Sequence, residues 1–338
     1  MFLQLLQQMF LILMGKVLKR QFELNEINDT KSCPKIQKIK VNIAIYETKQ
    51  EDYPSCADEW DSYHGILIPG SFSTAYEDAT TPWIRRLARE IQEEIHAKAR
   101  KTIGICFGHQ LFAHSFGEGG VRTPNANVSK KMQRKYIAEK CNRKHDLGSG
   151  DGCEDGDDKN DASNVEGGRA IACPKGTQVG KISFLTSQAG EYLLRPNNPG
   201  VVTLYYTHGD MVHSLPSCAV CLGGSTSVPI QSAAYFASTA DAHRFLHELN
   251  DGNSGIKRIR EDCATMPYAF SFQAHLEMAS DFGLSGTFTN ILNVFEEKGV
   301  LPKEILEASR KEAVASFPRV ERDSVDMMLQ ISSVLGWI

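Results

Sequence analysis

The stretch "TIGICFGHQLFAHSFG", Thr102–Gly117, places one cysteine between two glycines, directly after a short apolar run. The run before Cys106 is typical of a buried strand, and "HQLFAHSFG" predicts a helix that closes at Gly117. A strand, a tight turn and a helix form the layout of a nucleophile elbow, in which glycines two positions before and after the nucleophile let the backbone turn sharply. Taken alone, the stretch is equally compatible with a packing thiol in front of a helix.

Apolar β-rich runs and helical patterns alternate around this stretch. Lys40–Glu47 and Gly65–Ser71 predict buried parallel strands. The segment that follows them has apolar residues at helical spacing, with Thr81 as a plausible N-cap and Pro82 at the first helical position. Further apolar runs lie at 180–184, 200–210, 232–238 and 269–277. The alternation predicts an α/β fold, a three-layer sandwich with a central, mostly parallel sheet.

The 338 residues divide into three parts by composition. Residues 1–38 form a poorly defined N-terminal extension, residues 39–283 a domain that contains the Cys106 turn, and residues 284–338 a C-terminal extension with helical spacing. Within the domain, a basic block followed by an acidic block predicts a disordered insertion at about 119–166, because so polar a segment buries little apolar surface. The formal net charge of −4 gives no general attraction to nucleic acid or anionic membrane.

The N-terminus begins with an apolar run of about 14 residues, whereas a membrane span needs about 18 or more. Basic residues follow this run instead of preceding it, unlike a secretory signal. We expect no stable membrane span. The readings left open are an extension with no role in the fold, an organelle-targeting segment and an anchor.

Nine scattered cysteines suggest reduced thiols and a cytoplasmic location.

A cysteine nucleophile needs a base, and the base needs a group that orients it. His275 ends the apolar run "AFSFQAHLE", and Glu277 follows two residues later. If that run is a parallel strand, His275 emerges at the same sheet edge as Cys106. The alternative is a strand-end histidine without a catalytic role.

Two of these segments together carry a family resemblance. "GICFGHQLFAHSFGEGG" resembles the nucleophile segment of class I glutamine amidotransferases, G-x-C-x-G-x-Q, and "FSFQAHLE" resembles their closing segment, usually Q-G-H-P-E. "HGILIPGSFSTAYEDATTPWIRRLAREI" and "TLYYTHGDMVHSLP" resemble segments of the stand-alone subgroup that includes the γ-glutamyl peptidases. The resemblance covers roughly residues 40–280 and implies a flavodoxin-like fold.

The resemblance implies a cysteine hydrolase that cleaves γ-glutamyl amides, such as glutamine, a glutathione conjugate or a γ-glutamyl peptide, through a thioester on the cysteine. It implies no cofactor, no metal and no nucleic-acid partner. The residues that it carries over are a Cys106, His275 and Glu277 triad, an oxyanion hole of Gly70, Ser71 and Phe107, and substrate contacts from Gln110, His208, Gly209 and Asp210.

Three positions depart from the family pattern. Ala274 and Leu276 replace the usual Gly and Pro beside His275, and Met211 replaces an acid that commonly follows His-Gly-Asp. These departures leave two alternatives to a γ-glutamyl peptidase. One is a glutaminase subunit that delivers ammonia to a separate acceptor subunit, and the other is a catalytically degenerate binding or regulatory protein of the same fold.

Overall fold

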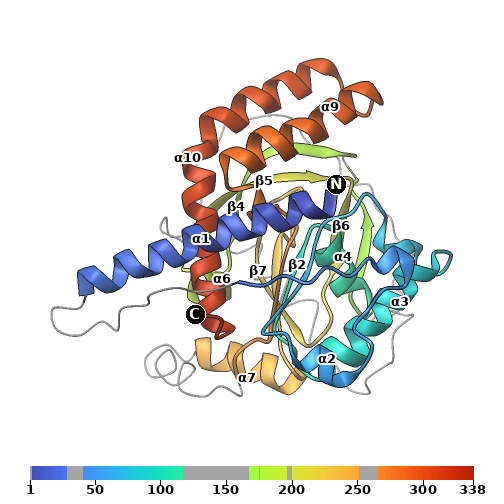
Figure 1. The fold of residues 1–338 in the computed structure, drawn as a ribbon, viewed down its shortest axis with the longest axis vertical. Helices are drawn as coiled ribbons and strands as arrows, with labels where there is room; N and C mark the ends of the chain where they lie inside the picture. Colours follow the sequence, from blue (N-terminus) through green and yellow to red (C-terminus); the bar gives the residue numbers. More distant parts are fainter. Residues whose placement is uncertain (1, 29–40, 117–166, 175, 196–199, 251–264) are drawn as a thin grey trace.

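The computed structural model describes residues 2–28, 41–116, 167–174, 176–195, 200–250 and 265–338. The predicted insertion at 119–166 lies outside the described residues, and so does Gly117, the predicted end of the elbow helix. Figure 1 shows a central sheet with helices on both of its faces, so the predicted three-layer α/β arrangement is confirmed.

The central sheet has seven strands in the order β1-β2-β9-β8-β7-β4-β5. Their bounds are β1 Ile66–Ile68, β2 Thr102–Ile105, β4 Gln178–Thr186, β5 Val201–His208, β7 Ala219–Gly224, β8 Ser232–Tyr235 and β9 Ala269–Phe272. The pairs β1–β2 and β2–β9 are parallel, and the other four pairs are antiparallel. The prediction of a mostly parallel sheet is therefore wrong: the sheet is mixed. Only residues 225–231 join β7 to β8, which is too short for a parallel crossover.

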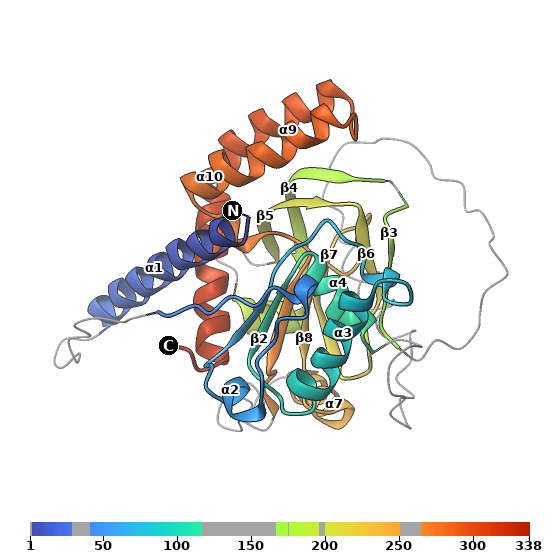
Figure 2. The same ribbon diagram turned by 45° about the vertical axis from the view of Figure 1, so that its right-hand side comes forward.

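One face of the sheet is covered by α3 and α4, and the other by α6, α7 and α10, while α1 packs across α10 (Figure 1 and Figure 2). A separate antiparallel pair, β3 and β6, lies beside α4. The helices and the pair span α1 Phe2–Asn28, α2 Ala57–Asp61, α3 Pro82–Glu90, α4 Phe107–His114, β3 Arg169–Ala172, α6 Gln188–Leu194, β6 Asp210–Ser214, α7 Thr239–Asn250, α9 Thr289–Glu297 and α10 Lys303–Val334. Short 3₁₀ turns lie at Thr48–Gln50 (η1), Ala75–Glu77 (η2) and Leu276–Met278 (η5), and π-helical turns at Ile91–His96 (η3) and Gly283–Phe288 (η6).

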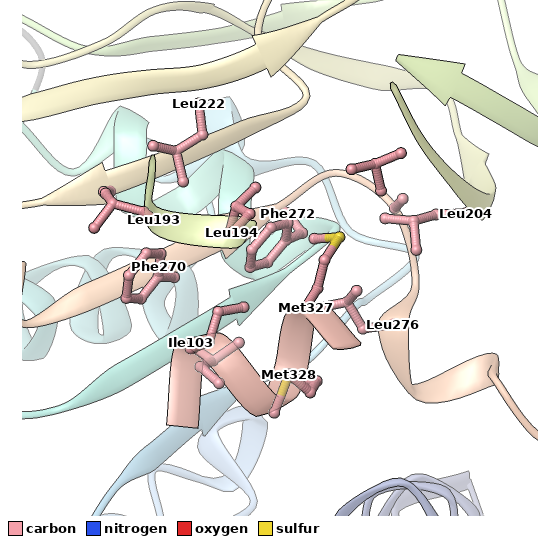
Figure 3. Close-up of a cluster of buried hydrophobic side chains, with 14 of the residues drawn as sticks. Ile103, Leu193, Leu194, Leu204, Leu222, Phe270, Phe272, Leu276, Met327 and Met328 are labelled. Atoms are coloured by element: carbon pink, nitrogen blue, oxygen red, sulfur yellow. The ribbon is translucent and has the colours of Figure 1, made fainter. Parts of the chain in front are cut away.

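The larger core lies between the sheet and the α6–α10 face. Figure 3 shows sheet residues such as Ile103, Phe270 and Phe272 against Leu193 of α6 and Met327 of α10. All five side chains are at most 2 % exposed. Burying such side chains contributes about 1.5–3 kcal/mol each relative to leaving them in water, so the tail helix α10 is part of the core that holds the sheet.

The predicted strand at Lys40–Glu47 is not a strand. Residues 41–47, the part that the structure describes, run without regular structure, and most of their side chains are exposed. The Gln7 amide of α1 donates to the Ile43 carbonyl at 3.4 Å. Because periodicity reports only that a run is apolar, it cannot tell a sheet strand from a chain that packs beside a helix.

The N-terminal residues form the long helix α1, whose Met9, Leu13 and Val17 side chains are at most 1 % exposed. These side chains belong to the same apolar clusters as residues of α9 and α10. None of the helices in the described ranges is long and apolar enough to span a bilayer.

Candidate active site

Cys106 occupies the turn between β2 and α4. Its N–H donates to the Phe272 carbonyl of β9 at 2.7 Å, and its carbonyl accepts the Gln110 N–H of α4 at 3.0 Å. The residue has φ 52° and ψ −105°, a conformation that a side-chain-bearing residue adopts only when its surroundings impose it. The predicted nucleophile elbow is therefore present as geometry, with the strain at the cysteine itself.

The flanking glycines are needed for close approach. A methyl group at Gly108 would lie 2.1 Å from the Ile68 carbonyl oxygen at the end of β1. A methyl group at Gly104 would lie 2.9 Å from the Gly108 carbonyl oxygen. Both distances are shorter than real contacts, so hydrogen at these positions is what lets α4 start directly over the ends of β1 and β2.

His275 and Glu277 follow β9 in the loop that becomes η5. His275 Nδ1 and Glu277 Oε1 are 2.6 Å apart, and the His275 N–H donates to the Tyr205 carbonyl of β5 at 2.8 Å. Both side chains are buried. Burial by itself lowers the pKa of the His275 imidazolium, yet the Glu277 carboxylate and a hydrogen bond with Cys106 outweigh it and raise that pKa to about 10.

The cysteine and the histidine meet at Gly70. A methyl group there would lie 3.1 Å from His275 Cε1 and 3.3 Å from Cys106 Cβ. Thr207 at the end of β5 touches both groups: its carbonyl lies 3.8 Å from Cys106 Sγ, and its hydroxyl lies 3.4 Å from His275 Nε2. The predicted thiol, base and orienting carboxylate are thus brought together.

Two of the predicted oxyanion residues, Gly70 and Phe107, adjoin Cys106. Gly70 follows β1, and Phe107 is the first residue of α4, whose N–H has no partner within its own helix. The Ser71 hydroxyl accepts the Ser73 N–H at 3.2 Å and so shapes the loop after Gly70.

His208 is a second buried histidine, at the end of β5, and its protonation is opposite to that of His275. Its Nδ1 lies 3.0 Å from the Asp210 carbonyl, so Nδ1 carries the hydrogen, and 3.4 Å from Cys173 Sγ. Burial and the charge of His275 lower the pKa of His208 to about 4, although the Asp210 carbonyl opposes this. His208 is therefore neutral at physiological pH, and its buried Nε2 contacts no hydrogen-bonding group among the described residues.

The remaining predicted substrate residues lie on the turn from β5 to β6 and on α4. The Gly209 carbonyl accepts the Cys173 N–H at 2.8 Å. The Asp210 carboxylate accepts the Tyr76 hydroxyl at 3.0 Å, and burial raises the pKa of this carboxyl group despite that hydrogen bond. Gln110 is buried, and its amide nitrogen donates to the Asp210 carbonyl at 2.9 Å, so this amide nitrogen points into the protein.

Sequence reasoning missed three residues of this site: Thr207, Tyr76 and Gln273. Gln273 is fully buried, and its Nε2 lies 3.8 Å from Cys106 Sγ. The signal for it was present in "FQAHLE", because residues two apart on an extended chain share a face and Gln273 precedes His275 by two. Among the residues that the structure describes, no group of three or more His, Cys, Asp or Glu side chains could hold a metal ion.

The chain matches the glutamine amidotransferase class-I family over residues 30–231, a range that includes Cys106 and ends before His275. It is 40 % identical over 57 residues to gamma-glutamyl peptidase 4 of Arabidopsis thaliana, which is 17 % of this chain and 22 % of that protein. It is 32 % identical over 74 residues to a glutamine amidotransferase-like protein of Schizosaccharomyces pombe, which is 22 % of this chain and 29 % of that protein. The aligned parts thus span about a third or less of these relatives.

Solved structures were also found to be similar. A glutamine amidotransferase from Thermotoga maritima is 15 % identical, with a TM-score of 0.49 over 86 % of this chain and 85 % of that one. One from Methylobacillus flagellatus is 15 % identical, with a TM-score of 0.48 over 84 % of this chain and 81 % of that one. The family match covers more than half of the sequence and includes the elbow, and on that basis the chain belongs to the class-I glutamine amidotransferase family.

Proposed function

We propose that the protein is a cysteine hydrolase of γ-glutamyl amide bonds, of the γ-glutamyl peptidase type. The observation that carries the proposal is the meeting of the strained Cys106 with His275 beside Gly70, with Glu277 2.6 Å behind the imidazole. A thiol, a base, an orienting carboxylate and backbone donors are the parts that acyl transfer from an amide requires.

The reaction would begin when Cys106 Sγ attacks the γ-carbonyl carbon and forms a C–S bond. His275 Nε2 holds the proton that the thiol has given up, because Nδ1 is bound to Glu277. The carbonyl oxygen becomes an oxyanion that the Phe107 N–H and a donor from the loop Gly70–Ser71 stabilise. As the tetrahedral intermediate collapses, His275 gives its proton to the leaving amine, the C–N bond breaks, and a γ-glutamyl thioester remains.

The second half returns the enzyme to its starting state. Water attacks the thioester carbonyl and gives a proton to His275, and the C–S bond breaks with the electron pair on Sγ. Glu277 stabilises the imidazolium at each stage, in agreement with the raised pKa of His275. The products are glutamate and the free amine.

The glutamyl end would be held by the turn from β5 to β6. The Asp210 carboxylate, beside the Tyr76 hydroxyl, can accept from the substrate's α-ammonium group. Gln110 and Gly209 would contribute by fixing the backbone of this turn, since the Gln110 amide donates to the Asp210 carbonyl and the Gly209 carbonyl accepts from Cys173.

The test is a turnover panel with the purified chain on glutamine, a γ-glutamyl dipeptide, glutathione and a glutathione S-conjugate. We expect amine release without any partner, and a loss of at least about a thousandfold in Cys106→Ser with unchanged thermal unfolding. Cys56→Ser is the matched control, because Cys56 is exposed. Turnover that survives in Cys106→Ser would refute the scheme. Ammonia release from glutamine only when a second protein is added would identify a glutaminase subunit.

A further inference from the structure

We infer that Gln273 is a dedicated hydrogen-bond donor to the Cys106 thiolate, held in that orientation by Gln110. This inference rests on the proposed role of Cys106 as the nucleophile. It assigns to Gln273 a part in preparing the sulfur that differs from the role of the base His275, while Gln110 supports both Gln273 and the turn that would hold substrate.

The orientation of both amides follows from one fixed acceptor. A backbone carbonyl can only accept, so the Gln110 atom 2.9 Å from the Asp210 carbonyl must be nitrogen. The same nitrogen lies 3.2 Å from one terminal atom of the Gln273 amide, which must therefore be the oxygen. The other terminal atom of Gln273 is then Nε2, and it is the one that lies 3.8 Å from Cys106 Sγ.

Burial increases the importance of the contact between the Gln273 amide and the Cys106 sulfur. Gln273 is fully buried and Cys106 is 6 % exposed, so bulk water has little access to the sulfur. A buried thiolate without donors is unfavourable, and a donor that is already in place lowers this penalty before substrate arrives. Gln273 is uncharged, so unlike His275 it can keep donating at every stage of proton transfer.

The ionisable groups around the sulfur come from separate elements. His275 and Glu277 lie on the loop after β9, His208 lies at the end of β5, and Cys173 lies just after β3. Of these four groups, only His275 lies within two residues of Gln273 in the sequence. The amide effect can therefore be measured by substitution while the four ionisable groups are retained.

The experiment measures how fast iodoacetamide alkylates Cys106 as a function of pH in the full-length chain, read peptide by peptide by mass spectrometry, with exposed Cys56 as internal reference. No substrate is needed, so the result is independent of whether γ-glutamyl amides are the substrate. In Gln273→Leu, we expect Cys106 to react about tenfold more slowly at pH 7, because loss of the donor should shift the rate–pH curve of Cys106 to higher pH. Cys56 should react as before.

Two further variants separate donation from packing. Gln273→Met keeps the length of the unbranched side chain but removes the N–H donor, so it should slow alkylation of Cys106 about as much as Gln273→Leu does. Gln231→Leu is the matched control. Gln231 is also fully buried, and it lies just before β8, where its carbonyl accepts the Gln273 N–H at 2.8 Å. Its side-chain amide has no hydrogen-bond partner among the described residues. Gln231→Leu should leave the Cys106 rate unchanged.

The inference is overturned if Gln273→Leu alkylates at the wild-type rate, or if Gln231→Leu slows Cys106 as much. It is also overturned if Gln273→Met alkylates at the wild-type rate, because a purely steric role would survive in a side chain of similar length. Thermal unfolding is recorded for each variant, and if Gln273→Leu does not fold, the comparison of Gln273→Met with wild type decides. A failure here with normal γ-glutamyl turnover would leave the proposed function standing.

Discussion

The two halves of the site are built in different ways. The Cys106 half is local: one strand, one turn and one helix within 102–114 set the backbone of the nucleophile. The half with His275 and Glu277 stands on a short loop whose position depends on distant parts of the chain. The His275 N–H is bound by Tyr205 of β5, and the loop packs against α1 and α10.

The difference explains how the departures from the family pattern can be accommodated. Ala274 and Leu276 stand where the pattern has Gly and Pro, and both are fully buried in the large core. Apolar packing of these side chains can take the place of the backbone restriction that proline would give. The His275–Glu277 contact at 2.6 Å forms with these residues present.

The largest effect is expected from a substitution in the Cys106 half of the site, at Gly108. Gly108→Ala would place a methyl group 2.1 Å from the Ile68 carbonyl, and backbone cannot move aside as a flexible side chain can. We expect the free energy of unfolding to fall by about 3 kcal/mol, although alanine favours helix by about 1 kcal/mol. Urea unfolding measures this. Gly15→Ala on α1, where a methyl group meets nothing within 4 Å, is the control and should be neutral or stabilising.

A smaller and pH-dependent effect is expected from Glu277→Gln. The pKa of His275 is raised from 6.5 to about 10, so the stability from its bound proton is complete below about pH 6.5 and is lost as the pH rises through about 10. Glutamine keeps a hydrogen-bonding group but removes the charge. We expect wild type to be more stable by about 2 kcal/mol at pH 6, with a gap that narrows toward pH 10. A gap that stays constant with pH would contradict the ion pair.

The smallest effect is expected from Lys16 of α1, which contacts the loop that carries His275 and Glu277. Lys16 of α1 donates to the Ala279 carbonyl at 3.2 Å, just beyond η5, and also forms an ion pair with Glu321 of α10. Lys16 is partly exposed, so Lys16→Met should lower the free energy of unfolding by only about 0.5 kcal/mol. It should lower turnover about twofold by loosening the loop. Lys19→Met, on the exposed side of the same helix, should change neither, and equal behaviour of the two variants would refute this support.

What could be predicted from the sequence follows the same division. The elbow, the helix that begins at Pro82 and the strand before Cys106 were predicted from short patterns, and the structure has each of them. Thr81 does stand at the N-cap, although its side chain makes no capping hydrogen bond. The strand at Lys40–Glu47 and the mostly parallel sheet were wrong, because strand pairing depends on partners far away in the chain.

The sequence by itself determined that Cys106 stands on a strained turn, since glycines on both sides and the strand–helix pattern are local properties. It also determined the two-residue spacing of His275 and Glu277. Only the tertiary structure decided that these residues meet at Gly70 and that the two histidines have opposite protonation. It likewise decided that Gln110 supports Gln273, because burial and hydrogen-bond partners come from strands that lie far apart in the sequence and adjacent in space.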